Sequence, residues 1–101
     1  MSSSIVYLNG EFLPLNEARV PVLDRGFIFG DGVYEFIPVY SGRLFRLDEH
    51  LERLNNSLDA VRIDNPYPES EWKRILSQIV MKHDEPDQTI YLQVTRGVAP
   101  R

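Results

Sequence analysis

The sequence has no cysteine, only two lysines and no long hydrophobic run. The lack of cysteine excludes a disulfide framework, a thiolate zinc site and a cysteine nucleophile. The longest apolar run covers residues 36–40, far short of the roughly 20 residues that a membrane-spanning helix needs. Lysine and arginine total 11 against 15 acidic residues, giving a net charge of −4. A nucleic-acid-binding protein normally carries a basic surplus, so we expect neither a membrane partner nor a nucleic-acid partner.

The composition that is present is typical of one globular domain. The chain has 101 residues, of which 43% are hydrophobic and 26% charged, ordinary values for a folded protein. No internal repeat, low-complexity tract or linker divides it, so residues 1–101 are interpreted as a single domain. The first residues, Met1-Ser2-Ser3-Ser4, lack the basic and apolar regions of a signal peptide. We therefore expect a cytoplasmic protein.

Strand signals occur in both halves of the chain. Residues 5–8 and 11–15 predict a hairpin, because Asn9-Gly10 between them favours a tight turn. Residues 33–40 predict a long strand with Tyr34 facing opposite to Glu35. Within that strand Pro38 cannot donate to a ladder, which indicates an edge position or a bulge. Residues 43–47 predict a second hairpin arm, and alternating apolar residues predict a final strand over 90–95.

Two segments have the apolar spacing of amphipathic helices. Asp48 is a plausible N-cap for the first, and Pro68 fits the first turn of the second. The apolar stripe of the first helix comprises Leu47, Leu51, Leu54, Leu58 and Val61. That of the second comprises Trp72, Ile75, Leu76, Ile79 and Val80.

The order of these elements, strands followed by two helices and a strand, predicts an α+β fold. Antiparallel hairpins would form a sheet, and both helices would pack on one of its faces. A glycine-rich segment precedes the long strand, with Gly30 and Gly32 on either side of an aspartate. It lacks the Gly-Lys-Ser/Thr ending of a nucleotide-binding loop. We expect these glycines to serve a tight turn, in an ordered loop with at most one turn of helix.

Arg53 is the first candidate for chemistry, because it projects about 120° away from the apolar stripe at roughly 100° per residue. Its guanidinium could bind a phosphate or carboxylate in a bidentate fork. Alternatively, it forms a surface ion pair with Glu49, one turn earlier. His50 on the same side of the helix could orient Arg53, or could simply pack at the margin of the core.

Other polar residues admit both a functional and a structural interpretation. The hydroxyl of Tyr34 can donate to a carboxylate, but a buried strand tyrosine would also explain it. Arg96 and Arg101 follow the last strand, either as binding residues on a loop or as exposed charges. Lys73 and Lys82 fit surface positions rather than the buried amine of Schiff-base chemistry. The histidine and acidic residues are not spaced as a metal site.

Three segments together resemble the class IV, fold type IV, pyridoxal-phosphate aminotransferases. Residues 24–35, Asp-Arg-Gly-Phe-Ile-Phe-Gly-Asp-Gly-Val-Tyr-Glu, are similar to that family's signature loop. Residues 45–54, Phe-Arg-Leu-Asp-Glu-His-Leu-Glu-Arg-Leu, resemble its helix with a phosphate-binding arginine. Residues 90–101, ending in Val-Ala-Pro-Arg, resemble the strand and loop of its D-amino-acid branch in particular.

The resemblance implies roles for three residues and a cofactor. Arg53 would bind the phosphate of pyridoxal 5'-phosphate, while Tyr34 and Arg101 would bind the α-carboxylate of the substrate. Arg101 would reach into the site of the neighbouring subunit of a homodimer. The small-molecule substrates would be a D-amino acid and a 2-oxo acid, between which the amino group moves.

The resemblance also implies that part of the enzyme lies outside this chain. The family's Schiff-base lysine belongs to a C-terminal domain, so residues 1–101 would be an N-terminal domain without a catalytic residue of its own. The alternatives are a branched-chain aminotransferase, an aminodeoxychorismate lyase, or, in another class, a non-catalytic module that binds a small anion or a protein.

Overall fold

A computed structural model describes residues 4–100. The elements follow one another along the chain as β1 (Ile5–Leu8), β2 (Glu11–Pro14), the 3-10 helix η1 (Leu15–Glu17), α1 (Arg25–Phe29), β3 (Gly32–Tyr40), β4 (Arg43–Leu44), α2 (Leu47–Val61), α3 (Glu69–Met81) and β5 (Gln88–Thr95). The predicted α+β class with antiparallel strands is therefore confirmed. None of the helices within residues 4–100 is long and apolar enough to cross a membrane.

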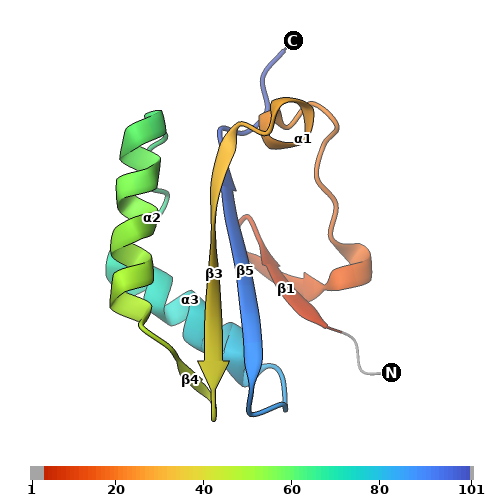
Figure 1. Ribbon diagram of the computed structural model, residues 1–101. Helices are drawn as coiled ribbons and strands as arrows, with labels where there is room; N and C mark the ends of the chain where they lie inside the picture. The colour runs from red at the N-terminus through yellow and green to blue at the C-terminus, as the bar shows by residue number, and fades with distance from the viewer. Residues whose placement is uncertain (1–3, 101) are drawn as a thin grey trace.

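The strands form two separate sheets rather than one. β1 and β2 make a two-stranded hairpin, and a second, three-stranded sheet has the order β4-β3-β5. β3 and β5 pair along their length in antiparallel register, from Gly32 opposite Thr95 to Val39 opposite Gln88. The expectation of one continuous sheet of hairpins is corrected in this respect. The long β3–β5 pair is what positions the residues discussed below (Figure 1).

The second hairpin is shorter than predicted, because β4 ends at Leu44 instead of Leu47. Phe45 donates its backbone N–H to the carbonyl of Pro38 at 2.8 Å. In an antiparallel pair the return bond would come from the N–H of Pro38, which proline does not have. Pairing beyond β4 therefore stops there, and β3 is flanked by β4 only at Val39 and Tyr40. Pro38 therefore lies at an edge of the sheet on its β4 side, while on the other side it pairs with Thr89 of β5.

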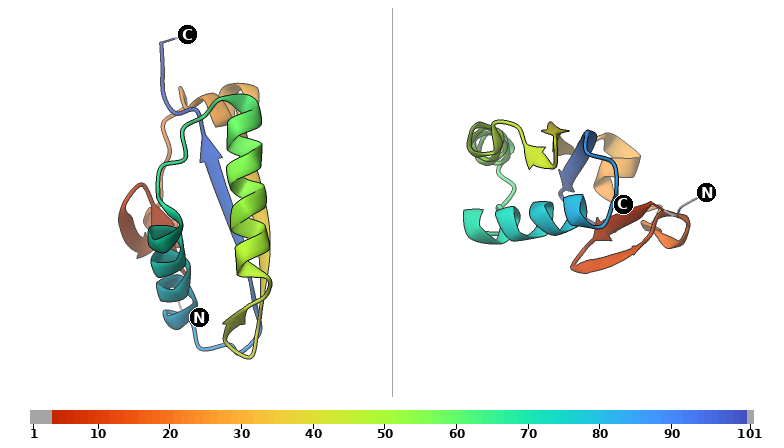
Figure 2. Two further views of the ribbon diagram at one scale, coloured as in Figure 1. Left: turned by 90° about the vertical axis from the view of Figure 1, so that its left-hand side faces the viewer. Right: turned by 90° about the horizontal axis from the view of Figure 1, so that it is seen from below.

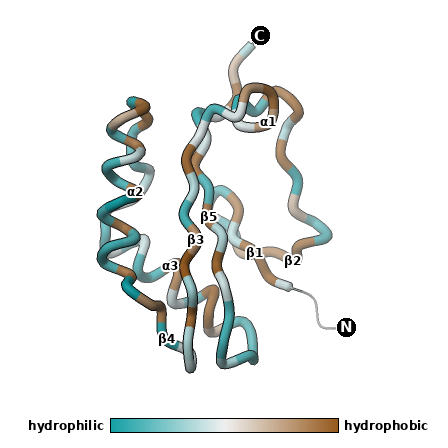
Figure 3. Tube along the Cα trace, viewed as in Figure 1, coloured by the Kyte–Doolittle hydropathy of each residue, from teal (hydrophilic) through white to brown (hydrophobic). Residues whose placement is uncertain are grey.

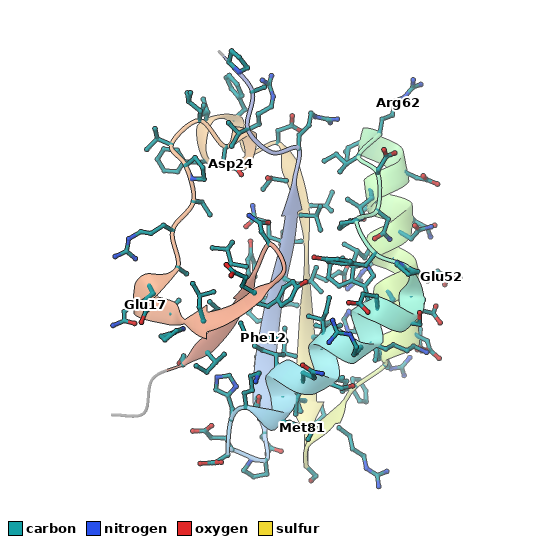
Figure 4. All side chains as sticks on the ribbon, turned by 180° about the vertical axis from the view of Figure 1, so that it is seen from behind. Phe12, Glu17, Asp24, Glu52, Arg62 and Met81 are labelled. Atoms are coloured by element: carbon teal, nitrogen blue, oxygen red, sulfur yellow. The ribbon has the colours of Figure 1, made fainter. Side chains whose placement is uncertain are left out.

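The two long helices cover one side of the larger sheet. α2 lies alongside β3 in Figure 1, and α3 lies in front of the strands when the molecule is seen from behind in Figure 4. Figure 2 shows the same layering from the side and from below. The opposite face of β3 and β5, toward the viewer of Figure 1, has no helix over it. The molecule is accordingly thin, measuring 42 × 31 × 18 Å.

The core lies between the sheet and the helices, and the predicted apolar stripes supply it. In Figure 3 the hydrophobic residues of α2 recur among hydrophilic ones, as such a stripe requires. Val61 is an exception, since it is 38% exposed at the end of α2. The buried apolar side chains are Ile37, Val39, Leu51, Leu54, Leu58, Trp72, Ile75, Leu76, Val80 and Leu92.

Asp48 is not the N-cap of the first long helix, contrary to the sequence expectation. The N-cap of α2 is Arg46, two residues before Asp48, in the left-handed region with φ 54°, and the helix begins at Leu47. Asp48 instead lies in the first turn, and its carboxylate contacts Nζ of Lys73 on α3 at 2.8 Å. An acidic residue there complements the helix dipole. Pro68 is the N-cap of α3, one residue before the predicted first turn.

The glycine-rich segment before β3 contains α1, the expected short helix. Gly30 ends it with φ 64°, a conformation that glycine adopts at little cost. Gly32 has a different reason to be glycine, because a Cβ there would lie 2.6 Å from the carbonyl oxygen of Val94. The close approach of β3 and β5 at this point therefore depends on the missing side chain.

Candidate functional site

One charged side chain is buried within residues 4–100, and it belongs to β3. Glu35 is 4% exposed, because alternation along the strand turns it toward α2, with Ile37 and Val39 on the same face. A buried carboxylate is costly unless it is paired and hydrogen-bonded. Its partners therefore identify the polar centre of the fold.

Arg53 of α2 binds this carboxylate with two hydrogen bonds. Nε donates to Oε2 of Glu35 and Nη2 donates to Oε1, each at 2.9 Å. This is the parallel, two-bond geometry that makes arginine–carboxylate pairs specific. The alternative of an ion pair with Glu49 is wrong, since Glu49 pairs with Arg46 at 3.3 Å. The buried carboxylate across the strand offers arginine a drier and better matched partner than its helical neighbour.

His50 completes the cluster from one turn earlier on α2. Its Nδ1 lies 2.8 Å from Oε1 of Glu35, and since an ionised carboxylate only accepts hydrogen bonds, Nδ1 is the donor. The side chain is 14% exposed. Both interpretations of His50 therefore hold in part: it packs at the margin of the core, and it braces the carboxylate that binds Arg53.

The environment keeps Glu35 ionised. Burial raises the pKa of Glu35, but the hydrogen bonds from Arg53 and His50 outweigh it and hold the pKa below the ordinary value of 4.5. The hydrogen bonds that Arg53 makes to Glu35 raise the pKa of Arg53. At neutral pH the pair is therefore a carboxylate and a guanidinium.

Arg53 keeps part of its binding capacity free. Its side chain is 66% exposed, and Nη1 makes no hydrogen bond to any residue in the range 4–100. A guanidinium fixed on one edge and open on the other is suited to an oxygen-rich anion such as a phosphate.

Tyr34, the residue before Glu35, points to the opposite, helix-free face of the sheet. It is 62% exposed and stacks on Tyr91 of β5, with ring centroids 5.6 Å apart. No residue of the described chain hydrogen-bonds to its hydroxyl, so the phenol is available as a donor. The interpretation of Tyr34 as a buried strand tyrosine is therefore wrong.

The surroundings of Tyr34 were not identified from the sequence. Tyr91 donates its hydroxyl to Oε1 of Gln93 at 3.0 Å, and Phe36 meets the Tyr91 ring edge to face at 5.8 Å. These residues form one aromatic patch on β3 and β5, which we call the open aromatic face: Tyr34, Phe36, Tyr91 and Gln93. Pairing the predicted strands 33–40 and 90–95 in antiparallel register would have been the signal that brings them together.

The other sequence candidates are placed as follows. Lys73 contacts Asp48 and also Glu69, at 3.3 Å, and Lys82 lies over the ring of Phe12 at 4.8 Å, in keeping with surface lysines. Arg101 lies outside the described residues. Within residues 4–100 no three histidine, aspartate or glutamate side chains are grouped as a metal site requires.

Tyr34 and Arg53 lie on exposed surface on different sides of the sheet, and neither lies in an enclosed cavity. A cavity of about 1000 Å³ does exist, between β1, α3 and β5, but neither Tyr34 nor Arg53 lines it. Its wall is mainly apolar, with Tyr7, Trp72 and Ile75 among the lining residues. The donors that β3 and α2 present face outward instead, where a ligand or a further part of the protein would meet them.

Comparison with known proteins places this arrangement among the transaminases. The chain is 47% identical over 96 residues to a D-alanine aminotransferase of Bacillus licheniformis and 43% identical over 96 residues to that of Staphylococcus haemolyticus. Each match covers 95% of this chain and 34% of the relative. The chain thus spans about a third of the length of the curated relatives it matches.

Solved structures agree in fold. A branched-chain aminotransferase from the thermophilic archaeon Thermoproteus uzoniensis, solved with norvaline, superposes with a TM-score of 0.77 at 30% identity, over 91% of this chain and 32% of that one. A fold IV transaminase from Curtobacterium pusillum superposes with a TM-score of 0.80 at 27% identity, over 87% of this chain and 32% of that one. The family model for amino-transferase class IV matches residues 32–101, the stretch that holds Tyr34, Glu35 and Arg53. The chain therefore belongs to the class IV aminotransferase family.

Proposed function

We propose that this chain is the N-terminal domain of a pyridoxal-phosphate-dependent enzyme that transfers an amino group from a D-amino acid to a 2-oxo acid. The identity of 40–47% to D-alanine aminotransferases supports this substrate class. The branched-chain enzymes match at lower identity. The intact enzyme would act in the cytoplasm as a homodimer.

The observation that carries the proposal is the arrangement of Arg53. Glu35 occupies Nε and Nη2, so the guanidinium has a fixed direction, and Nη1 remains for a ligand. This donor suits the doubly charged phosphate of pyridoxal 5'-phosphate, which needs fixed cationic donors. When bound, the cofactor would supply the electron sink for amino-group transfer.

Tyr34 and Arg101 are proposed to bind the substrate α-carboxylate. Tyr34 offers a phenol hydroxyl that has no hydrogen-bond partner among the described residues. It lies on the open aromatic face, next in sequence to the carboxylate that holds Arg53. Arg101 would act in the site of the neighbouring subunit. A phenol and a guanidinium together provide both direction and charge for a carboxylate.

The reacting amine is proposed to come from beyond this chain. Lys73 is held by two carboxylates, and hydrogen bonding to Asp48 raises its pKa. A nucleophilic lysine needs the opposite shift, toward a lower pKa. Residues 1–101 would accordingly bind and orient, while a C-terminal domain completes the site.

The test is an assay of the full-length protein that carries this segment. We expect turnover of D-alanine with a 2-oxo acid, little turnover of L-leucine, and no lyase activity on aminodeoxychorismate. Turnover of L-leucine alone would establish the branched-chain alternative. A full-length protein that binds no pyridoxal phosphate would favour a non-catalytic binding module.

A further inference from the structure

Arg96, directly after β5, joins three parts of the fold with one side chain. Its Nε donates to Oδ2 of Asp31, in the turn before β3, at 2.7 Å. Its Nη2 donates to the carbonyl of Val61 at 2.8 Å and its Nη1 to the carbonyl of Arg62 at 3.3 Å, both at the end of α2. All three guanidinium nitrogens are therefore used within the chain.

The α2 end is a suitable partner for a cation. Arg62 has φ 60° and ends the helix, and the last carbonyls of a helix have no partner within it and carry partial negative charge. Figure 4 shows Arg62 at the same end of the molecule as Asp24, the N-cap of α1. Arg96 thus satisfies carbonyls that the helix itself leaves open.

Within residues 4–100, backbone hydrogen bonds join the exit of β5 to the α1 region but not to α2. Arg96 N–H donates to the carbonyl of Asp31 at 3.1 Å, and Arg25 N–H donates to the carbonyl of Gly97 at 2.8 Å. Among the hydrogen bonds of residues 4–100, only the Arg96 side chain links this exit to the end of α2. The Asp31 carboxylate that Arg96 binds is ionised at neutral pH, since hydrogen bonding to Arg96 holds the pKa of Asp31 below its ordinary value.

Of the three parts that Arg96 joins, the turn before β3 and the exit of β5 lead to the two proposed carboxylate ligands. Tyr34 is three residues after Asp31, and Arg101 is five residues after Arg96. Arg53, by contrast, is fixed by Glu35 about 12 Å before the end of α2 at 1.5 Å per residue. The Arg96 junction therefore serves the carboxylate ligands and is separate from the contact that holds the phosphate ligand.

We propose that Arg96 is a positioning residue for substrate binding, which holds the turn before Tyr34 and the exit of β5 against the end of α2. The proposal rests on the aminotransferase function proposed above. Because Asp31 and the carbonyls at the end of α2 occupy its guanidinium, Arg96 is assigned no contact of its own with substrate or cofactor. Its loss displaces the groups that bind the substrate carboxylate, and misplacement by about 1 Å costs on the order of 100-fold in the function of a positioned group.

The test compares Arg96→Met with Arg74→Met in the full-length holoenzyme. Arg74 also forms a two-bond pair, with Glu71 on the exposed side of α3, so its variant makes the same charge change elsewhere. We expect Arg96→Met to raise KM for the amino acid that the wild type turns over by about 10- to 100-fold, with kcat changed less. Loss of binding that is equal in ground and transition states has this signature. We expect Arg74→Met to leave KM unchanged.

A second readout separates positioning from a general loss of structure. Retention of pyridoxal phosphate after dialysis, followed by cofactor absorbance, remains at the wild-type level in Arg96→Met if the proposal holds. Arg96→Lys keeps the charge but not the planar set of donors, and we expect its KM to lie between those of Arg96→Met and the wild type. If Arg96→Met does not fold, Asp31→Asn removes the same contact from the other side, and we expect a smaller rise in KM.

The outcomes that overturn the proposal are distinct from those that overturn the function. An active wild type with unchanged KM in both Arg96→Met and Asp31→Asn removes the positioning role alone. A parallel loss of cofactor and kcat with unaltered KM also removes it, since Arg96 would then support the whole fold. A wild type that turns over no amino acid contradicts the aminotransferase function and this proposal with it.

Discussion

The Glu35 carboxylate accepts two hydrogen bonds of 2.9 Å from Arg53, although the two residues are 18 positions apart. The carboxylate is buried and the guanidinium is mostly exposed. Glu35 is therefore the buried anchor of the pair, fixed inside the fold, and Arg53 is its projecting end, the side chain that a ligand can reach. The two residues therefore respond differently to substitution.

Replacing Arg53 tests the projecting end. In the full-length protein we expect Arg53→Ala to weaken pyridoxal-phosphate retention by about 10- to 100-fold, as loss of one or two charge-assisted hydrogen bonds would. Cofactor absorbance after dialysis measures it. Arg46→Ala is the matched control, because Arg46 makes an exposed ion pair with Glu49 at the start of the same helix, and we expect retention in that variant to be unchanged. Equal retention in both variants would return Arg53 to a surface role.

Replacing Glu35 tests the anchor. Glu35→Gln removes the charge but keeps the shape, so Arg53 and His50 lose charge-assisted bonds. We expect the free energy of unfolding at pH 7 to fall by about 1–3 kcal/mol, measured by urea denaturation. Glu49→Gln, on the exposed side of α2, leaves it within about 0.5 kcal/mol of wild type. A Glu35→Gln protein as stable as wild type would show that the ionised form contributes nothing.

The same carboxylate makes the stability of the fold depend on pH in the acid range. Because the pKa of Glu35 in the fold lies below its ordinary value of 4.5, the stabilisation is present above pH 4.5 and is lost as pH falls toward the lowered pKa. Hydrogen bonds to arginine lower the pKa values of Asp31 and Glu71 in the same direction. We expect a shallower loss of stability with acid in Glu35→Gln than in wild type. Identical slopes in the two proteins would contradict this.

Tyr7 makes the stability of the fold depend on pH in the alkaline range. Burial and then the hydrogen bond with Tyr67, at 2.7 Å, raise the pKa of Tyr7 from 10.0 to about 12. The fold thus favours the neutral phenol, and this stabilisation is complete below pH 10 and is lost between pH 10 and about 12. We expect Tyr7→Phe to remove the late step of an ultraviolet tyrosine titration. Tyr40→Phe, on an exposed ring, serves as the control and leaves that step in place.

The open aromatic face predicts the behaviour of the isolated 101-residue chain. Contiguous exposed apolar surface promotes association, and Phe36 and Tyr91 are 54% and 55% exposed on one face. We expect Phe36→Lys to lower the mean mass of the isolated chain in sedimentation at equal concentration. Met81→Lys changes a side chain that is 81% exposed at the end of α3; an equal effect there would show that the aromatic face is not the cause.

The sequence predicts the elements that local pattern determines. Alternation in residues 33–40 correctly separates Tyr34 from Glu35, and the leucine spacing of α2 correctly gives Leu51, Leu54 and Leu58 as core residues. Both periodicities are local properties of the backbone. They require no knowledge of which segments pack together.

The polar contacts were not accessible in this way, because they join segments far apart in the chain. Arg53 has an acidic residue one turn before it, yet it binds Glu35 of the adjacent strand β3. The reason is that a buried carboxylate needs a partner more than an exposed one does. Asp48 has the chemistry of an N-cap, yet it binds Lys73 of α3. In both cases the packing of α2, and not its own sequence, selects the partner.

The adjacent positions of Tyr34 and Glu35 on one strand have a consequence for how this segment can change. Neighbouring strand residues face opposite sides of a sheet, so gaining or losing a single residue earlier in β3 would exchange the two. The phenol would then enter the apolar interior while the acid emerged into water, and both proposed ligand contacts would be lost together. Insertions in this stretch are therefore tolerable only in pairs.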